Sequence, residues 1–397
     1  MEVCVLLVVQ KYGGTSVGTP KRILRVADRI AERRAAGDRI VAVVSAMGQT
    51  TDTLLSLAHR ITPHPSRREM DMLLTTGERI SMALLSMALE ARQVPAISFT
   101  GSQSGIITDT AHTRARILEI RPIRILPELE RDRVVIVAGF QGVSRDKEIT
   151  TLGRGGSDTT AIALAVGLNA DRCEIYTDVP GVMTADPRHV GKARLLPRIS
   201  WDTMLELAAS GAGVMHTRAV ELAGRRSVPF RVRSAFTKRE GTMVEGKAIE
   251  QGAGIAAVTG VPQVLEVKIK GIDVLRRLEG MNLLTGLRGL TTDGSGMRFF
   301  IPADSNNEHV LEGIVRSVGG ELSVTRNLAA VTLVGTGLLE ISRVVGEASK
   351  VLATAPPIPV HALMSTTIAV TLYVPEGSYA EALRRLHEAF VESTARE

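Results

Sequence analysis

The first 235 residues alternate short, uniformly apolar runs with segments of helical periodicity. Apolar runs of strand length predict strands over residues 3–9, 39–45 and 134–138, and a further strand is predicted over 174–177. Strands that are apolar on both faces, with helices between them, are typical of a mostly parallel sheet covered on both sides. The pattern therefore predicts the α/β fold class for this part of the chain.

Helices are expected between these strands, and two of them have recognisable starts. Thr19 followed by Pro20 predicts a cap and a first-turn proline for a helix that reaches about residue 36. Ser66 and Glu69 form a capping-box pattern ahead of a long helix that reaches about residue 93. Shorter helices are predicted over residues 54–60 and 158–166.

The pattern changes after residue 244. The stretch 245–257 is small, glycine-rich and aperiodic, which predicts a linker. Two segments of similar rhythm follow, and tandem βαββα units of this kind predict a pair of small ferredoxin-like modules. Strand, helix, strand, strand and helix are expected near 264–270, 272–278, 282–290, 297–302 and 308–318, and again near 330–334, 339–353, 360–364, 368–374 and 379–390. The expected domains are 1–246, 259–327 and 328–397.

Composition narrows the classes of partner. The chain has 397 residues, of which 44% are apolar and 23% charged, so a disordered or fibrous protein is excluded. With 7 Phe, 4 Tyr and 1 Trp, a base-stacking nucleic-acid surface is not expected. Lys and Arg exceed Asp and Glu by 48 to 42, a net charge of +6 spread along the chain without a basic block. This distribution favours anionic small molecules over nucleic acid.

Cysteine usage and hydropathy predict a cytoplasmic protein. Cys4 and Cys173 lie far apart, without a CxxC pattern or a Cys/His cluster, so neither a disulfide framework nor a structural zinc site is expected. The first ten residues carry Glu2 instead of a basic segment and run into a glycine turn, which indicates a buried strand and not a signal peptide. No apolar stretch reaches about 18 residues, so no membrane span is expected.

The first candidate site is the segment from Lys11 to Ser16, between a predicted strand and a predicted helix. Gly13 and Gly14 allow the backbone to approach a phosphate, which N–H groups ahead of a helix can bind, and Lys11 adds a positive charge. Neither GxxxxGK[ST] nor GxGxxG is present. A tight surface turn with a solvated lysine is the alternative interpretation.

The second candidate is TLGRGGSDTT at 151–160, where Arg154 stands among three glycines ahead of a helix. Glycine-rich backbone and a guanidinium together suit an anion, and Asp158 either takes part or only caps the helix. A weaker candidate is the turn-rich loop 177–188, because ligands bind at the carboxyl ends of strands in such sheets. Weakest is Glu78 beside Arg79, for which a solvated ion pair is the default expectation.

Together these segments resemble the aspartokinase family within the amino-acid kinase fold. The resemblance is carried, in chain order over the first 235 residues, by VVQKYGGTSVG, VSAMGQTTD, EMDMLLTTGERIS, SFTGSQSGIITD, VAGFQGV, TLGRGGSDTTAIALA, EIYTDVPGVMTADPR and VPFRVRS. It implies transfer of the γ-phosphoryl group of MgATP to the β-carboxylate of L-aspartate. The product would be 4-phospho-L-aspartate, the first step toward lysine, threonine and methionine, and the two C-terminal modules would be ACT modules.

The resemblance also implies residue roles. Lys11 would neutralise charge on the transferring group, and Asp158 would orient the lysine side chain at the reaction centre. Arg154 would hold the α-carboxylate of aspartate and Glu78 its α-ammonium group. Further substrate contacts are implied for Ser45, Thr51 and Ser157. Nucleotide contacts are implied for Lys11, Tyr12, Gly13, Gly14, Gly155, Gly156, Thr177, Asp178, Met183, Thr184, Ala185, Asp186, Pro187, Arg188 and Arg194.

The chemistry implied needs positioning more than acid–base catalysis. A side-chain carboxylate of pKa about 3.9 is already ionised at pH 7, so the attacking oxygen needs no general base. The reaction needs in-line placement of two anions and screening of their repulsion. Mg²⁺ is expected to be bound mainly through the nucleotide phosphates, and no protein metal ligand is assigned.

The chain departs from the family pattern at several points. Pro180 and Met183 stand where many relatives have Asp and Tyr, and HTR at 216–218 replaces His-Pro-Arg. IKGIDVLRRLEGM lacks the Asp-x-Pro-Gly turn of the first ACT module, and GTGLLEIS lacks the Pro-Gly turn of the second. We therefore expect the ACT pair to serve mainly as a homodimerisation and scaffolding element, and we assign no residues to a lysine or threonine effector.

Two alternatives remain open. One is another kinase of the same fold, acting on glutamate, N-acetylglutamate or a nucleoside monophosphate; the pairing of GERIS with TLGRGGSD, together with the ACT modules, speaks against it. The other is a catalytically silent, amino-acid-binding regulator, which is disfavoured because Lys11, Arg154 and Asp158 are all present.

Overall fold

The computed structural model describes residues 5–246, 254–270, 286–292, 296–303, 311, 321–336 and 341–393. The chain divides into two compact units. The first comprises Met1–Val182, Leu195–Leu205 and Gly213–Lys247, and the second Met183–Arg194, Glu206–Ala212 and Ala248–Glu397. Within the described part of the chain, no helix has the length and apolar character needed to cross a membrane.

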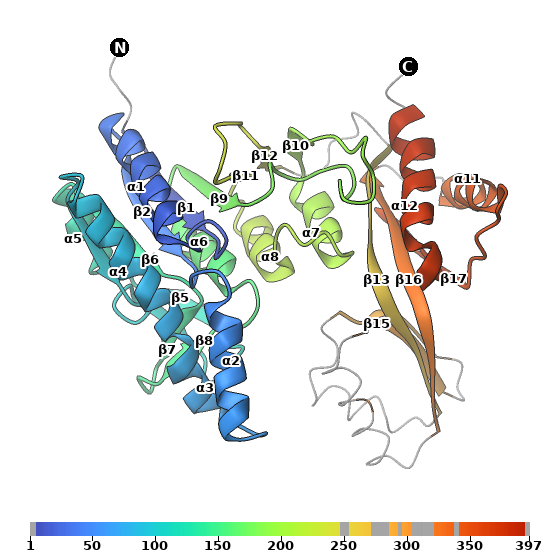
Figure 1. Cartoon of the computed structure of the whole chain (residues 1–397), viewed down its shortest axis with the longest axis horizontal. Coiled ribbons are helices and arrows are strands. Elements are labelled where there is room, and N and C mark those ends of the chain that lie inside the picture. The colour runs from blue at the N-terminus through green and yellow to red at the C-terminus, as the bar shows by residue number, and fades with distance from the viewer. Residues whose placement is uncertain are drawn as a thin grey trace. The chain divides into compact units, whose positions relative to one another are not determined.

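An eight-stranded sheet forms the centre of the first unit (Figure 1). Neighbouring strands are parallel except β11 and β12, which confirms the predicted mostly parallel α/β sheet. In spatial order the strands are β10 (Arg198–Ile199), β12 (Thr242–Val244), β11 (Phe230–Ser234), β9 (Arg172–Thr177), β1 (Leu7–Tyr12), β2 (Arg39–Val44), β6 (Val134–Ala138) and β3 (Ala96–Phe99).

Helices cover both faces of this sheet because its central strands are buried on both sides. On β1, Val8 packs with side chains of α1 and α4 on one face, while Val9 is buried on the opposite side of the strand. α6 contacts β1, β2 and β9. The helices of this region are α1 (Pro20–Ala35), α2 (Thr50–Ile61), α3 (Arg67–Leu74), α4 (Thr76–Glu90), α5 (Ile125–Glu130), α6 (Gly156–Gly167) and α8 (Thr217–Arg225). The residues of α7 (Trp201–Ala209) are divided between the two units.

The start of α1 is as predicted, whereas the long helix expected after Ser66 is not. Thr19 caps α1 by accepting a hydrogen bond from Arg22 N, with Pro20 in the first turn. Ser66 makes no side-chain capping bond and Glu69 pairs instead with Arg68, so the capping box is wrong. The predicted single helix is divided at Thr75 into α3 and α4.

A small four-stranded sheet, which the sequence pattern did not predict, lies in the first unit beside α3 (Figure 1). Its strands are three or four residues long, too short to show periodicity. In spatial order they are β5 (Ile117–Ile120), β4 (Ile106–Thr108), β7 (Gln141–Ser144) and β8 (Ile149–Thr151). β8 leads directly into the glycine-rich segment before α6.

The second unit contains one six-stranded antiparallel sheet. Its order is β14 (Arg288–Thr292), β15 (Gly296–Pro302), β13 (Gly254–Lys270), β16 (Leu322–Thr336), β18 (Ala369–Pro375) and β17 (Ala362–Ser365). α11 (Ile341–Ala353) and α12 (Tyr379–His387) pack against it. β13 begins at Gly254, so the last residues of the predicted linker are strand. The helix expected over 272–278 lies outside the described residues, as does nearly all of the one expected over 308–318.

The two similar segments share this sheet through its central pair, β13 and β16. The expected module boundary at 327 and 328 falls within β16. Asn327 there has a left-handed φ of 61°, and the β13–β16 register shifts between Val261 and Glu266. A β-bulge of this kind bends and twists a strand without ending it, so both segments remain in one continuous sheet.

Candidate active site

An ion pair joins the ends of two elements at the carboxyl edge of the parallel sheet. Lys11 lies near the end of β1 and Asp158 in the first turn of α6, with Nζ 2.6 Å from Oδ1. Asp158 does not cap α6, because the N-cap position belongs to Gly155. The alternative of a solvated lysine is therefore wrong, and so is that of a purely capping aspartate.

The glycine segment after β1 is held by close backbone contacts. Gly13 N donates to Tyr176 O, and Gly48 N donates to Gly14 O. A Cβ on Gly14 would lie only 2.8 Å from Ala46 O, so a larger residue would push the two loops apart. A Cβ on Gly13 would meet Lys11 Nζ at 3.4 Å, which places this backbone beside the ammonium group. The loop thus combines a cation with closely approached backbone, as an anion site requires.

Glu78, in the first turn of α4, is buried and forms no solvated pair with Arg79. Its side chain is 3% exposed, and Oε1 accepts a hydrogen bond from Ala46 N at 3.1 Å. Oε2 is buried without a hydrogen-bond partner in the described structure. Burial raises the pKa of this carboxyl to about 7, although the Ala46 hydrogen bond opposes the shift. A cation arriving at Oε2 would find an unpaired acceptor.

The segment between β8 and α6 is an arch of left-handed glycines. Gly153 and Gly155 have φ of 76° and 66°, a conformation that suits glycine. A Cβ on Gly155 would lie 2.1 Å from His216 Cβ, so packing also requires glycine there. Arg154, between them, is exposed and makes no ion pair or side-chain hydrogen bond with the residues that the structure describes. Its guanidinium is available to an anionic ligand.

The other predicted substrate residues lie at the same edge of the sheet. Ser45 follows β2, and its N–H donates to Tyr12 O. Thr51 is half-buried in the first turn of α2. Ser157 is buried beside the loop after β6, where a Cβ on Gly139 would come within 2.7 Å of Ser157 Oγ. The carboxyl ends of β1, β2 and β6 and the start of α6 therefore converge.

The predicted nucleotide residues differ in what they can offer. The Tyr12 side chain is fully buried, stacked on Tyr176 with ring centroids 4.8 Å apart, so only its main chain is available to a ligand. Gly155 and Gly156 form the start of α6. Thr177 and Asp178 follow β9, with Thr177 Oγ1 donating to the exposed Asp178 carboxylate.

The remaining predicted nucleotide residues, from Met183 onward, belong to the second unit. Thr184 is buried; its Oγ1 accepts from Arg194 N and lies 2.9 Å from His387 Nε2. Arg194 itself donates to a main-chain oxygen of the same unit. Within this segment, Asp186 and Arg188 pair with each other. Ala185 packs in the core of the second unit, and Pro187 lies between the paired residues.

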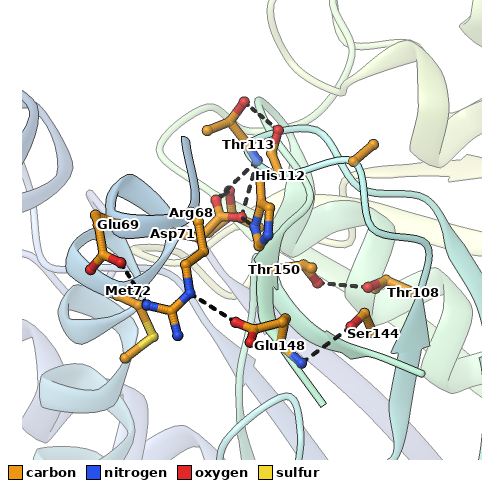
Figure 2. A network of polar contacts seen from close by, with 12 residues as sticks. Arg68, Glu69, Asp71, Met72, Thr108, His112, Thr113, Ser144, Glu148 and Thr150 are labelled. Carbon is orange, nitrogen blue, oxygen red and sulfur yellow. Dashed lines mark hydrogen bonds and ion pairs between the residues drawn. The ribbon is translucent and has the colours of Figure 1, made fainter. Parts of the chain in front are cut away.

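A buried carboxylate that the sequence analysis did not single out is Asp71, in α3. It accepts hydrogen bonds from Thr113 N and Thr151 Oγ1, and Oδ2 lies 2.6 Å from His112 Nδ1. Figure 2 shows Asp71 facing His112 and Thr113, with the exposed pair of Arg68 and Glu148 beside them. The available signal was an acidic residue between two methionines in a helix.

Comparisons with known proteins identify similar chains and structures. The Amino acid kinase family matches residues 7–234. An aspartokinase of Geobacillus stearothermophilus is 43% identical, and aspartokinase 2 of Bacillus subtilis is also 43% identical; each alignment covers 97% of both chains. E. coli aspartokinase III in complex with aspartate and ADP is similar in structure, with a TM-score of 0.85 at 25% identity over 96% of this chain and 99% of that one. Its complex with lysine and aspartate gives a TM-score of 0.73 at 25% identity over 97% and 99%.

Proposed function

The chain belongs to the aspartokinases of the amino acid kinase family, and from this premise we propose how its own residues carry the reaction. As an aspartate kinase it transfers the γ-phosphoryl group of ATP to the β-carboxylate of L-aspartate. The product, 4-phospho-L-aspartate, enters lysine, threonine and methionine synthesis. The assignments of individual residues below are proposals.

Lys11 is the proposed catalytic cation. The transferring phosphoryl group and the attacking carboxylate are both anionic, so a fixed positive charge lowers their repulsion most where negative charge accumulates. Asp158 holds the ammonium group at 2.6 Å and so sets its direction. The backbone of Gly13 and Gly14, beside Nζ, completes the phosphate cradle.

Arg154 and Glu78 are proposed to recognise the amino-acid end of aspartate. The free guanidinium of Arg154 suits a two-point contact with the α-carboxylate. The unpaired Oε2 of Glu78 suits the α-ammonium group, whose charge would favour the ionised carboxylate. An acceptor without both groups would leave one of these charges unpaired, which is the basis of selectivity. Ser45, Thr51 and Ser157 line the same edge of the sheet and complete the proposed aspartate site.

The nucleotide is proposed to enter as MgATP. Mg²⁺ prefers oxygen ligands and commonly remains bound through substrate phosphates, and the proposal assigns no protein ligand to it. The E. coli relative that binds ADP supports a nucleotide site in this chain. We place it, within the first unit, along Lys11, Gly13, Gly14, Gly155, Gly156, the main chain of Tyr12, Thr177 and Asp178.

The second unit is proposed to act mainly in homodimerisation and scaffolding. This interpretation rests on the missing Pro-Gly turns, and both turn regions lie largely outside the described residues. The E. coli relative has been solved with lysine, so an amino-acid effector is the competing hypothesis for this unit. Activity measured against lysine plus threonine distinguishes them: we expect no inhibition, and strong inhibition would overturn the scaffold proposal.

The observation that carries the site proposal is the convergence of Lys11, Asp158, Arg154 and Glu78 at one edge of the sheet. The test is ADP release from MgATP with L-aspartate, L-glutamate, N-acetylglutamate and UMP as acceptors. Turnover with aspartate alone is expected. Preference for another acceptor would overturn the roles given to Arg154 and Glu78. Absence of ADP release with all four acceptors would contradict the role of Lys11.

A further inference from the structure

Asp71 lies between the two elements that carry the proposed aspartate-binding residues. Its side chain, in α3, is 0% exposed. Charged side chains are rarely buried to this extent unless they are paired and hydrogen-bonded. Asp71 has four such contacts to groups that lie far from it in the sequence.

These contacts join three segments. Oδ1 accepts from Thr113 N at 3.0 Å and from Thr151 Oγ1 at 2.5 Å. Oδ2 accepts from Thr113 N at 3.1 Å and lies 2.6 Å from His112 Nδ1. The carboxylate therefore ties α3 to the turn at 109–116 and to the last residue of β8 (Figure 2).

The contact of Asp71 with Thr151 leads along the chain to the guanidinium group of Arg154. Thr151 O accepts from Ala115 N at 2.8 Å, which fixes the last residue of β8 on both its side chain and its main chain. Gly153 packs against the same turn, since a Cβ on it would lie 3.1 Å from Thr113 O. Arg154 is the next residue, and no described side chain holds its guanidinium. Its location depends on the backbone that Asp71 anchors.

The helix that carries Asp71 leads along the chain to the carboxylate of Glu78. Asp71 O accepts from Thr75 N at 3.2 Å, at the junction of α3 and α4. Thr75 O in turn accepts from Gln141 Nε2 at 3.2 Å. Glu78 follows in the first turn of α4. The Thr75 N bond to Asp71 O is the ordinary last main-chain bond of α3, so the Asp71 carboxylate acts on Glu78 only by holding α3, whose end at Thr75 leads directly into α4.

We propose that Asp71 is a positioning residue that fixes the separation of Arg154 and Glu78 and thereby sets the affinity for aspartate. The inference rests on the proposed function, because it assumes that these two groups hold the substrate. Asp71 acts through them and does not touch the substrate. The neighbouring pair of Arg68 and Glu148 is exposed on both sides, so it has little influence on the same contact.

The test compares matched variants by their separate KM values for aspartate and ATP. Thr151→Val removes one donor to Asp71 at nearly constant shape, whereas Thr151→Ser keeps the hydroxyl. We expect Thr151→Val to raise the KM for aspartate about three- to tenfold, and Thr151→Ser about twofold or less. Asp71→Asn, which turns an amide donor toward existing donors, should raise it about tenfold or more. Glu148→Gln serves as the surface control and should leave both KM values unchanged.

The readout separates positioning from a general loss of stability. A merely structural role would lower the fraction of active enzyme, and hence kcat, while both KM values stayed constant. Equal aspartate KM values in the wild type, Thr151→Val and Thr151→Ser would overturn the inference, even where Asp71→Asn fails to fold. If Arg154→Ala also leaves the KM for aspartate unchanged, the role proposed for Arg154 fails. If Arg154→Ala raises this KM and the Asp71 and Thr151 variants do not, only the present inference fails.

Discussion

The ammonium group of Lys11 lies 2.6 Å from the carboxylate of Asp158, and both side chains are nearly buried, with 12% and 10% exposed. The pair connects the end of β1 to the first turn of α6 through segments that are 147 residues apart in the sequence. In water such a pair would contribute little, but in a partly buried site it fixes the direction of the lysine. The first prediction follows from this contact.

Lys11→Ala should lower kcat by about a hundredfold to a thousandfold, because it removes a cation placed where charge develops. The KM for aspartate should change little. Steady-state ADP release at saturating MgATP measures both. Lys238→Ala, at an exposed lysine of the same unit, is the matched control and should behave as wild type. A larger effect on the aspartate KM than on kcat would assign Lys11 to substrate binding.

Arg154→Ala should change the KM for aspartate more than kcat, the reverse of what is expected for Lys11→Ala. Loss of a two-point charged contact to the α-carboxylate should raise the KM for aspartate by about tenfold to a hundredfold, with a smaller effect on kcat. Arg145→Ala, at an exposed arginine in the turn between β7 and β8, controls for the change in net charge. Similar KM changes in the Lys11 and Arg154 variants would contradict the division of roles between them.

Glu78 makes aspartate binding dependent on pH. Burial raises the pKa of its carboxyl to about 7, so below that pH the free enzyme must lose a proton before it pairs with an ammonium group. The KM for aspartate should therefore rise as the pH falls below about 7, and the pH profile of kcat/KM measures this. Glu78→Gln should bind aspartate weakly at every pH and lose this dependence; an unchanged profile in that variant would assign the titration to another group.

The same carboxyl should oppose stability at neutral pH. Its pKa in the folded chain lies above the unfolded value of 4.5, so its contribution is greatest below pH 4.5 and is lost as the pH rises through about 7. Glu78→Gln should therefore raise the free energy of unfolding at pH 8 by on the order of 1–3 kcal/mol and by little at pH 5. Denaturant unfolding at the two pH values tests this, and equal gains at both would contradict it.

Gly155→Ala should disrupt the start of α6. The residue has a φ of 66°, and a Cβ would lie 2.1 Å from His216 Cβ, so the arch that carries Arg154 must shift. We expect loss of aspartate turnover and a lower Tm. Gly346→Ala in α11, where a Cβ meets no atom within 4 Å, is the control and should raise helix stability by about 0.5–1 kcal/mol. A fully active Gly155→Ala enzyme would show that the conformation is not required.

The sequence predicted those helices and strands whose signal lies in their own residues. β2 and β6 are almost entirely apolar because both of their faces are buried, and that pattern is visible without any knowledge of tertiary contacts. The start of α1 is likewise encoded by Thr19 and Pro20 themselves. By contrast, the division between α3 and α4 depends on tertiary contacts: Thr75 O accepts from Gln141, and Gly77 packs against Ala46.

The residues of the candidate site fall into the same two groups: some have a signal in the sequence around them, and others depend on tertiary contacts. Lys11, Gly14 and Arg154 were identifiable because lysine, arginine and glycine at turns stand out from their surroundings. The local pattern alone favoured a solvated ion pair for Glu78, and only the family resemblance implied a substrate contact, since nothing in its helix indicates the hydrogen bond from Ala46 N, 32 residues away. Asp71 was missed because its partners lie in short polar strands and turns without periodicity.

The long central strands of the second unit bear on how such a chain can be shortened or rearranged. β13 has 17 residues and β16 has 15, and each pairs with the other across both halves of the sheet. A chain ending at residue 327 would lose most of β16 and uncover a long row of unpaired backbone groups on β13. Exposed edges of that kind promote aggregation. The two halves are therefore best exchanged between homologues as one cassette that keeps β13 and β16 together, along with the segment 183–194 that packs in the same core.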